Sequence, residues 1–439
     1  MYYWIRRRRI VWAPSGCGAV DLRQRNRNSL NTSRVEVWIM KIVFVIDSWN
    51  GGNGGVVATK RIVDELIARG HEIRVVSTGQ HEGPYEFFEV PGYYLPFVRE
   101  SLEKMNFLFA RGKTSVLRKA FEGADLVQVQ FPFFAARKAV RVAKKMGIPV
   151  TGACHVQPQN IIAAMGKEDP MMEKMFHALF NFCLFKQVDS IHCPSSFAAR
   201  LLLEHGSKAH FRVISNGIPR EYHPRRVSRP YWFADRFVIL NIGRHAMEKR
   251  QGLLIEGVLK SKYKDNIQLV LCGKGEDTEK LIESGRRLPV KPLIEYVTHE
   301  DKLLYLNAAD LYLHSSVVEL ESLSCLEAIG CGLPCLIGNS PHSAAPQFAL
   351  DERFLFAMDD SDSLAERIDY WYENRDALAG LKKPTLEMAE NYRMERCVTE
   401  LEVFFGEAAA GTLGAGEISG DVTEIQNDFY LTASGKRSA

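Results

Sequence analysis

Three glutamates interrupt a run of apolar and small residues, VVELESLSCLEAIGCGLP, which extends from residue 317 to 334. They are Glu319, Glu321 and Glu327. Because burying an unpaired carboxylate is strongly unfavourable, this stretch predicts cationic or hydrogen-bonding partners elsewhere in the chain. On one helix, residues eight apart would differ in direction by about 80°. The sequence therefore favours a loop that carries Glu319, followed by a helix that begins near Ser324 and carries Glu327.

The start of this helix is a candidate phosphate site. Its first amides have no intrahelical acceptor and carry a partial positive charge, so Leu323 and Ser324 are expected beside a diphosphate. Glu327 is expected to accept hydrogen bonds from a ribose diol, and Glu319 to reach the sugar beyond the diphosphate. Ser324-x-x-Glu327 also fits a capping box, which is a purely structural alternative for Glu327.

Two cations follow a Val/Ile-rich run in FVILNIGRHAMEKRQG. Arg244 and Lys249 lie five residues apart, across a loop that leads into a helical pattern. A guanidinium binds phosphate oxygens in a bidentate manner and an ammonium acts as a point charge, so this pair is suited to a diphosphate. The alternative is a surface loop with solvated charges.

A glycine-rich loop follows the first predicted strand, in IDSWNGGNGGVVATK. The loop contains Gly51, Gly52, Gly54 and Gly55. Glycines allow backbone amides to approach a ligand at the start of the next helix. The match to a dinucleotide fingerprint is weak, because position 57 is valine and the next strand ends in Ser77-Thr78 without an acid. A loop without a ligand remains the alternative.

His155 ends the predicted strand IPVTGACH and points toward the expected ligand site, although a histidine in this position is often structural. No metal site is predicted. Asp360 and Asp362 have the spacing of a metal-nucleotide motif but stand directly before a helix, where acids cap the N-terminus. The nine cysteines form no C-x-x-C pair, which favours buried free thiols.

Short Val/Ile/Leu runs alternate with helical patterns along 439 residues, which predicts an α/β protein with parallel sheets and two to three domains. The expected fold has two doubly wound Rossmann-like domains that face a cleft, where ligands bind beyond the carboxyl ends of the strands. The predicted division is a disordered basic extension (1–39), an N-terminal domain (40–215), a linker (216–235), a C-terminal domain (236–384), a final amphipathic helix (385–405) and a disordered tail (406–439).

The first 39 residues carry eight arginines against two acids and have no helical or strand period. Pro14 and the glycines near it leave no adequate apolar segment for a secretory signal, and MKIVFVID at Met40 is typical of a domain's first strand. We therefore interpret the segment as disordered or as an over-long start, with an arm that binds anionic lipid as the alternative. A net charge of +3 from 56 basic and 53 acidic residues argues against nucleic acid as a partner.

Together these motifs resemble the signature of retaining GT-B glycosyltransferases of family four, the glycosyltransferase group 1 enzymes. The resemblance covers about residues 40–405 and includes the Glu319-x7-Glu327 spacing continued by AIGCGLP, the Arg244–Lys249 pair, SNGI, GKGE and the glycine-rich loop. It departs from the family pattern at Leu320 and Ser322, which replace glycines, and in GNSPHSAAPQFALDE, which replaces a Gly-Gly loop.

The resemblance implies a hexosyltransferase that takes a hexose from a UDP- or GDP-sugar, bound mainly by the C-terminal half. Arg244 and Lys249 would neutralise the leaving diphosphate in place of a metal ion, with no other cofactor. Glu327 would bind the ribose, and Glu319 and His155 would lie at the reaction centre. The N-terminal half would bind the acceptor, and the final helix over 385–405 would cross back onto that half.

The acceptor half contains a mixture of basic and aromatic residues that suits an anionic membrane surface. It occurs in FPFFAARKAVRVAKK and in residues 91–121, whose aromatic residues include Tyr93, Tyr94, Phe97, Phe107 and Phe109. This mixture is similar to that of diacylglycerol glucosyltransferases, which implies a glycolipid acceptor and a cytoplasmic enzyme peripheral to the inner face of the cell membrane. The alternative is that the aromatics belong to the core.

Two other functions fit the same fold. One is a nucleotide-sugar 2-epimerase, which needs no acceptor. The other is a nucleotide-sugar-binding protein without catalysis, which the missing glycines favour.

Overall fold

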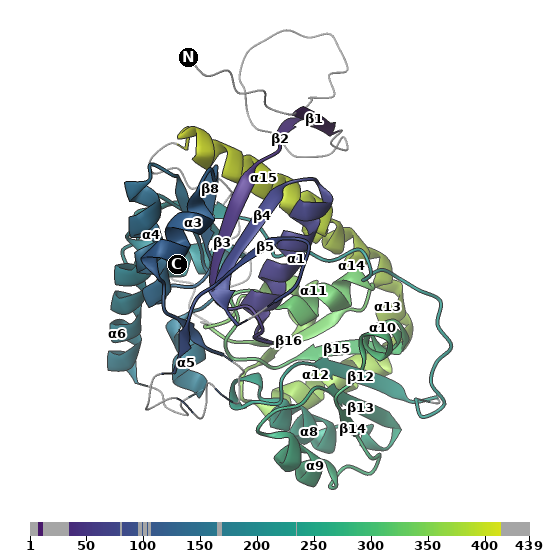
Figure 1. The fold of residues 1–439 in the computed structure, drawn as a ribbon. Coiled ribbons are helices and arrows are strands. Elements are labelled where there is room, and N and C mark those ends of the chain that lie inside the picture. The colour runs from purple at the N-terminus through teal and green to yellow at the C-terminus, as the bar shows by residue number, and fades with distance from the viewer. Residues whose placement is uncertain are drawn as a thin grey trace, which may run out of the picture.

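Two parallel β-sheets with flanking helices form the body of the molecule in this computed structural model (Figure 1). The structure describes residues 8–11 and 35–413, apart from 80, 95–98, 100–102, 104–106, 165–168 and 234. The alternation of apolar runs and helical patterns predicted this α/β architecture, and the prediction is confirmed.

The N-terminal sheet has seven parallel strands in the order β11-β10-β9-β8-β3-β4-β5. Its strands are β3 (Lys41–Ser48), β4 (Glu72–Thr78), β5 (Glu86–Glu89), β8 (Leu126–Val129), β9 (Val150–Ala153), β10 (Ser190–Cys193) and β11 (His210–Val213). The associated helices are α1 (Gly54–Ala68), α3 (Thr114–Phe121), α4 (Phe134–Lys145), α5 (Pro158–Ala164), α6 (Pro170–Phe180), a π-helical turn (Asn181–Phe185) and α7 (Ser196–Glu204). A small antiparallel pair joins β6 (Gly92–Tyr93) to β7 (Phe109–Ala110).

The C-terminal sheet has six parallel strands in the order β14-β13-β12-β15-β16-β17. They are β12 (Phe237–Ile242), β13 (Ile267–Cys272), β14 (Leu293–Glu295), β15 (Leu311–His314), β16 (Cys335–Asn339) and β17 (Leu355–Ala357). The helices of this half are α8 (Gln251–Lys260), α9 (Thr278–Gly285), α10 (His299–Ala308), α11 (Leu323–Gly330), α12 (Ser361–Glu373) and α13 (Arg375–Gly380). Strands β12 and β15 are adjacent, so the loops that follow them meet at one edge of the sheet.

The helix expected over 385–405 is divided in the structure. It consists of α14 (Lys382–Ala389), a 3₁₀ turn (Glu390–Tyr392) and α15 (Met394–Ala410). Helix α15 packs on the N-terminal half, where Glu402 binds Arg69 and His71. It extends past the predicted start of a disordered tail at 406 and ends at Gly411, whose φ of 66° stops a helix.

Both chain ends lie mainly outside the described residues. Two short strands, β1 (Arg8–Val11) and β2 (Val35–Trp38), pair antiparallel before the N-terminal sheet. The expected disorder of the rest of 1–39 and of 414–439 falls outside the part that the structure describes. The domain limits taken from the sequence stay a prediction. Among the described residues, no helix combines the length and apolarity that crossing a membrane requires.

Candidate active site between the two sheets

Lys249 and Glu319 form the central ion pair of the candidate site. The Lys249 Nζ lies 2.5 Å from Glu319 Oε1, although 70 residues separate them in sequence. Burial lowers the pKa of Lys249, but the carboxylates of Glu319 and Glu248 outweigh this effect and the net shift is upward. The ammonium is therefore charged, and the Glu319 carboxylate is its local counter-ion. A second partner, His314 Nε2, lies 3.6 Å from the same carboxylate oxygen.

Arg244 lies on the loop after β12 and is also held by acids. Its guanidinium is 2.6 Å from Glu248 Oε1 and 3.1 Å from Glu276 Oε1. The side chain is about one-third exposed, at 31%, so part of the guanidinium remains open to a ligand. The two predicted diphosphate-binding cations therefore share one neighbour, Glu248, between them.

The loop after β15 holds the backbone of the segment that carries Lys249. Ser315 donates to the Lys249 carbonyl (2.7 Å), and the Val317 amide donates to the Glu248 carbonyl (2.9 Å). Arg250 then takes a left-handed conformation (φ 51°), which allows the 3₁₀ turn Met247–Lys249 to lead directly into α8. Adjacent strands thus bring the segment of Lys249 beside the segment of Glu319.

The helix that carries Glu327 begins within one residue of the predicted position near Ser324. The N-cap of α11 is Ser322, whose hydroxyl accepts from the Cys325 amide, and the helix begins at Leu323. Ser324 lies in the first turn, with its hydroxyl 3.2 Å from that of Ser322. Ser324 is therefore not the N-cap and cannot form the capping box with Glu327, which removes the structural alternative proposed for Glu327. Leu323 and Ser324 remain the leading residues of a helix N-terminus, as predicted.

Glu327 forms a buried ion-pair cluster that joins the two halves. Its Oε1 is 2.5 Å from an Arg61 guanidinium nitrogen on α1, and its Oε2 is 3.2 Å from Lys302 Nζ on α10. Burial raises the pKa of Glu327, but Lys302 and Arg61 outweigh this effect and the net shift is downward, so the carboxylate is ionised. Arg61 also lies 3.5 Å from the Tyr222 hydroxyl.

The glycine-rich loop leads into the first turn of α1, next to α11 (Figure 1). Asn53 is the N-cap of α1 and accepts from the Val56 amide. A Cβ added to Gly54 would lie 4.0 Å from Leu323, across the boundary between the halves. Within the predicted set, Gly51 and Gly52 precede this helix, and Gly51 is buried whereas Gly52 is exposed.

Gly55 allows His155 to occupy its place after β9. A Cβ at Gly55 would lie 2.9 Å from His155 Cβ and 2.9 Å from the Phe131 ring. Burial and the nearby His192 ring lower the pKa of His155 to about 3, so its imidazole is neutral near pH 7. Its buried Nε2 has no hydrogen-bond partner among the described residues, which leaves a ring nitrogen available for a ligand hydroxyl.

Glu321, the third glutamate of the opening stretch, is buried where the linker meets the C-terminal helix region. Its Oε2 accepts from both the backbone amide and the side-chain amide of Asn216, each at 2.8 Å. Burial is the main cause that raises the pKa of Glu321 to about 7. This carboxylate therefore belongs to the junction between the halves rather than to the ion-pair cluster around Lys249.

Sequence reasoning missed four residues that the structure adds to this region. They are Arg61 and Lys302 on Glu327, His314 beside Glu319, and Gln157, whose side chain donates to the His342 carbonyl of the other half (3.1 Å). His314 ends strand β15, so the rule that ligands lie beyond strand ends would have found it. The other three carry no motif.

The basic and aromatic segments divide between core and surface. Phe107 and Phe109 are buried in a cluster with Phe131 and Phe133, so the interpretation of these aromatics as a membrane surface was wrong. Tyr93 and Tyr94 are half-buried, and Phe97 lies outside the described residues.

Comparisons with known proteins agree with this geometry. Residues 52–222 match the family model Glycosyltransferase Family 4, and residues 228–390 match the model Glycosyl transferases group 1. The chain belongs to the group 1 glycosyltransferases. Such an enzyme uses a nucleotide sugar. The first matched segment contains every strand of the N-terminal sheet except β3, and the second contains all six strands of the C-terminal sheet.

The glycosyltransferase is similar to two curated proteins. Alpha-monoglucosyldiacylglycerol synthase of Streptococcus pneumoniae is 23% identical over 320 residues, which are 69% of this chain and 72% of that protein. The protein of the same name from Acholeplasma laidlawii is 24% identical over 310 residues, which are 65% of this chain and 76% of that one.

Solved structures share its GT-B fold. Anabaena HepE in complex with UDP-glucose has a TM-score of 0.64 and 16% identity, over 85% of this chain and 100% of that one. Sucrose-phosphate synthase from Thermosynechococcus elongatus has a TM-score of 0.65 and 15% identity, over 85% of this chain and 100% of that one. The predicted fold is thereby confirmed.

Proposed function

We propose that this glycosyltransferase moves a hexose from a UDP- or GDP-hexose to a lipid acceptor, with retention of the anomeric configuration and without a metal ion at the diphosphate. The observation that carries the proposal is the Lys249–Glu319 ion pair. It joins the segment after β12, which also carries Arg244, to the loop that leads from β15 to the start of α11. The complex of Anabaena HepE with UDP-glucose favours UDP as the nucleotide.

In this proposal the diphosphate takes the place of the acids that now hold the cations. Lys249 and Arg244 turn to the β-phosphate, and the first amides of α11 donate to the same group, as fixed dipoles that stabilise the charge of the leaving group. The released Glu319 carboxylate accepts hydrogen bonds from the hexose. Glu327 binds the ribose, which requires the Arg61 guanidinium to move away or to share the carboxylate's remaining lone pairs.

Transfer then proceeds on one face of the sugar. The bond from the anomeric carbon to the β-phosphate oxygen breaks, and that oxygen leaves with the electron pair. The acceptor hydroxyl forms the new bond on the same face while its proton passes to the departing phosphate oxygen. His155, which is neutral and has an unpartnered ring nitrogen, hydrogen-bonds a hexose hydroxyl during this step.

The outer face of α4 supports a lipid acceptor. Its exposed cations are Lys138, Arg141, Lys144 and Lys145, and Phe134 at its start is 50% exposed. Exposed apolar side chains continue beside it on α6 and the π-helical turn, at Met171, Met175 and Phe182. Arg137 links the two elements by lying over the Phe182 ring. Cations beside exposed apolar groups suit an anionic membrane surface, and the two curated relatives are named for a diacylglycerol glycolipid.

The test combines UDP-glucose, UDP-galactose and GDP-mannose with diacylglycerol in anionic vesicles, and identifies products by mass spectrometry. We expect a glycolipid whose formation survives a chelator. Conversion of the nucleotide sugar without acceptor would instead identify an epimerase, and binding without turnover a non-catalytic protein. If the glycolipid forms equally well on zwitterionic vesicles, the proposed role of the α4 surface is wrong.

A further inference from the structure

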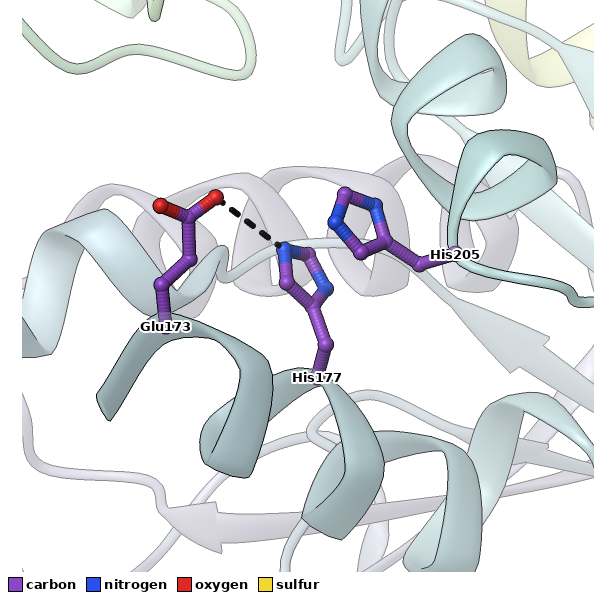
Figure 2. Close-up of side chains that lie close together, drawn as sticks. All are labelled: Glu173, His177 and His205. Carbon is purple, nitrogen blue, oxygen red and sulfur yellow. Dashed lines mark ion pairs between the residues drawn. The ribbon is translucent and has the colours of Figure 1, made fainter. Parts of the chain in front are cut away.

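Three metal-ligating side chains meet in the N-terminal half, outside the candidate donor site. Figure 2 shows Glu173, His177 and His205, whose ligand atoms all lie within 4.8 Å of one another. Glu173 and His177 are one turn apart on α6, so their side chains share one helix face. His205 is the C-cap of α7, which places it opposite that face.

The buried member of this group has an unsatisfied nitrogen. His177 is only 5% exposed, and its Nε2 has no hydrogen-bond partner in the described part of the chain. The nearest carboxylate oxygen, Glu173 Oε1, lies 3.7 Å away, beyond hydrogen-bond range. Buried polar atoms without partners are unusual in folded proteins, and a missing ion is one of their recurrent explanations.

The other two side chains make the outer hydrogen bonds that metal ligands usually make. His205 Nδ1 donates to the Leu201 carbonyl (2.8 Å), and this fixes the tautomer whose Nε2 lone pair is free. The Gln159 side chain donates to Glu173 Oε1 (2.7 Å), which orients the carboxylate. Outer partners of this kind are typical of ligating imidazoles and carboxylates.

We propose that Glu173, His177 and His205 bind one divalent transition-metal ion, with Zn²⁺ as the best fit to two imidazoles and one carboxylate. Three protein ligands leave a fourth tetrahedral position for water. In the structure the two imidazole rings stack, with centroids 3.3 Å apart and planes inclined by 11°. Metal binding must turn them out of this stack, so that each nitrogen comes to about 2.0–2.1 Å from the ion.

This site would stabilise the N-terminal half, which is the proposed acceptor half. Gln159 lies on α5, which begins just after Gln157, the residue that donates to the His342 carbonyl of the C-terminal half. A metal bound at Glu173 would therefore join α6 and α7 to the segment that follows His155. Its role in this arrangement is structural, at a distance from the diphosphate, so metal-independent transfer and a bound Zn²⁺ are compatible.

The test titrates the chelator-treated full chain with Zn²⁺ against a chromophoric indicator. We expect one equivalent to bind, Co²⁺ to give the intense visible bands of a tetrahedral site, and Zn²⁺ to raise the thermal midpoint. His177→Asn and His205→Asn should abolish binding. Gln159→Leu should weaken it by about 10–100-fold, as is typical for loss of an outer partner.

His223→Asn is the matched control, because His223 is exposed and lies in the linker. Should His177→Asn fail to fold, His205→Asn and Glu173→Gln decide the question, because His205 and Glu173 are only half-buried. The proposal is overturned if the wild type has no saturable site, or if His205→Asn binds Zn²⁺ with unchanged affinity. Either result would identify the cluster as an ordinary contact between helices.

Discussion

Replacing Glu321 with glutamine should stabilise the protein at alkaline pH and have little effect in acid. The carboxyl is buried, and its Oε2 already accepts two hydrogen bonds from Asn216 that a glutamine oxygen can also accept. Burial raises the pKa of Glu321 from 4.5 to about 7 in the folded chain. The folded state therefore holds this proton more tightly than the unfolded state does.

The sign and the size of the effect follow from this difference. Below pH 4.5 both states are protonated and the carboxyl causes no penalty. Between 4.5 and 7 the unfolded chain loses the proton first, so the stability of the wild type falls as pH rises, and the full penalty is present above 7. At 1.36 kcal/mol per pKa unit, the shift corresponds to about 3 kcal/mol at pH 8.

The assay compares the thermal midpoints of Glu321→Gln and wild type from pH 4.5 to 8. The advantage of the variant should grow by roughly 6–12 °C across this range, because about 2–4 °C corresponds to 1 kcal/mol in domains of this size. Glu283→Gln is the control, since Glu283 is 71% exposed. A difference between variant and wild type that does not change with pH would show that Glu321 is ionised in the folded protein and would refute the reasoning.

Three further substitutions test the candidate site. Lys249→Met should lower kcat/KM for the nucleotide sugar by about 10²–10³-fold, the usual effect of removing a charge-stabilising donor. The control, Lys260→Met on the exposed end of α8, should leave kcat/KM unchanged. Equal losses in the two variants would contradict the role of Lys249. Arg61→Ala should tighten UDP binding by about fivefold, or about 1 kcal/mol, because it frees the Glu327 carboxylate that Arg61 holds across the interface. Calorimetry measures the affinity, and weaker binding would instead make Arg61 part of the nucleotide site. Gly55→Ala should act mainly on kcat rather than on the thermal midpoint, because the new Cβ would lie 2.9 Å from the Cβ of His155 and displace that side chain. An unaltered kcat would show that the position of His155 is not critical.

The sheet strands were predictable because buried parallel strands require continuous apolar runs. KIVFVID and FVILNI are of this kind, and each became the strand that precedes a ligand loop. Neighbouring parallel strands present their following loops at one edge of the sheet. The meeting of Lys249 with Glu319 therefore follows from the order of the strands.

Contacts between the halves were not predictable in this way. Arg61 is separated from Glu327 by 266 positions in the sequence. It lies on a helix, where a polar residue predicts a solvent-exposed position but no particular partner. Its partner depends on how the two sheets are oriented, which no local pattern specifies. The N-cap of α11 was missed for a different reason, because Ser322 and Ser324 are both good caps and only the path of the preceding loop selects one of them.

The central claim is that the diphosphate is stabilised by Arg244, Lys249 and the first amides of α11. A crystal structure of the protein with UDP-hexose tests it most directly, through the distances from the β-phosphate oxygens to these groups. We predict hydrogen-bond distances of about 2.7–3.2 Å to both cations and to the amides of Leu323 and Ser324, with Lys249 moved away from Glu319. A nucleotide bound elsewhere, with the Lys249–Glu319 pair intact, would contradict the account.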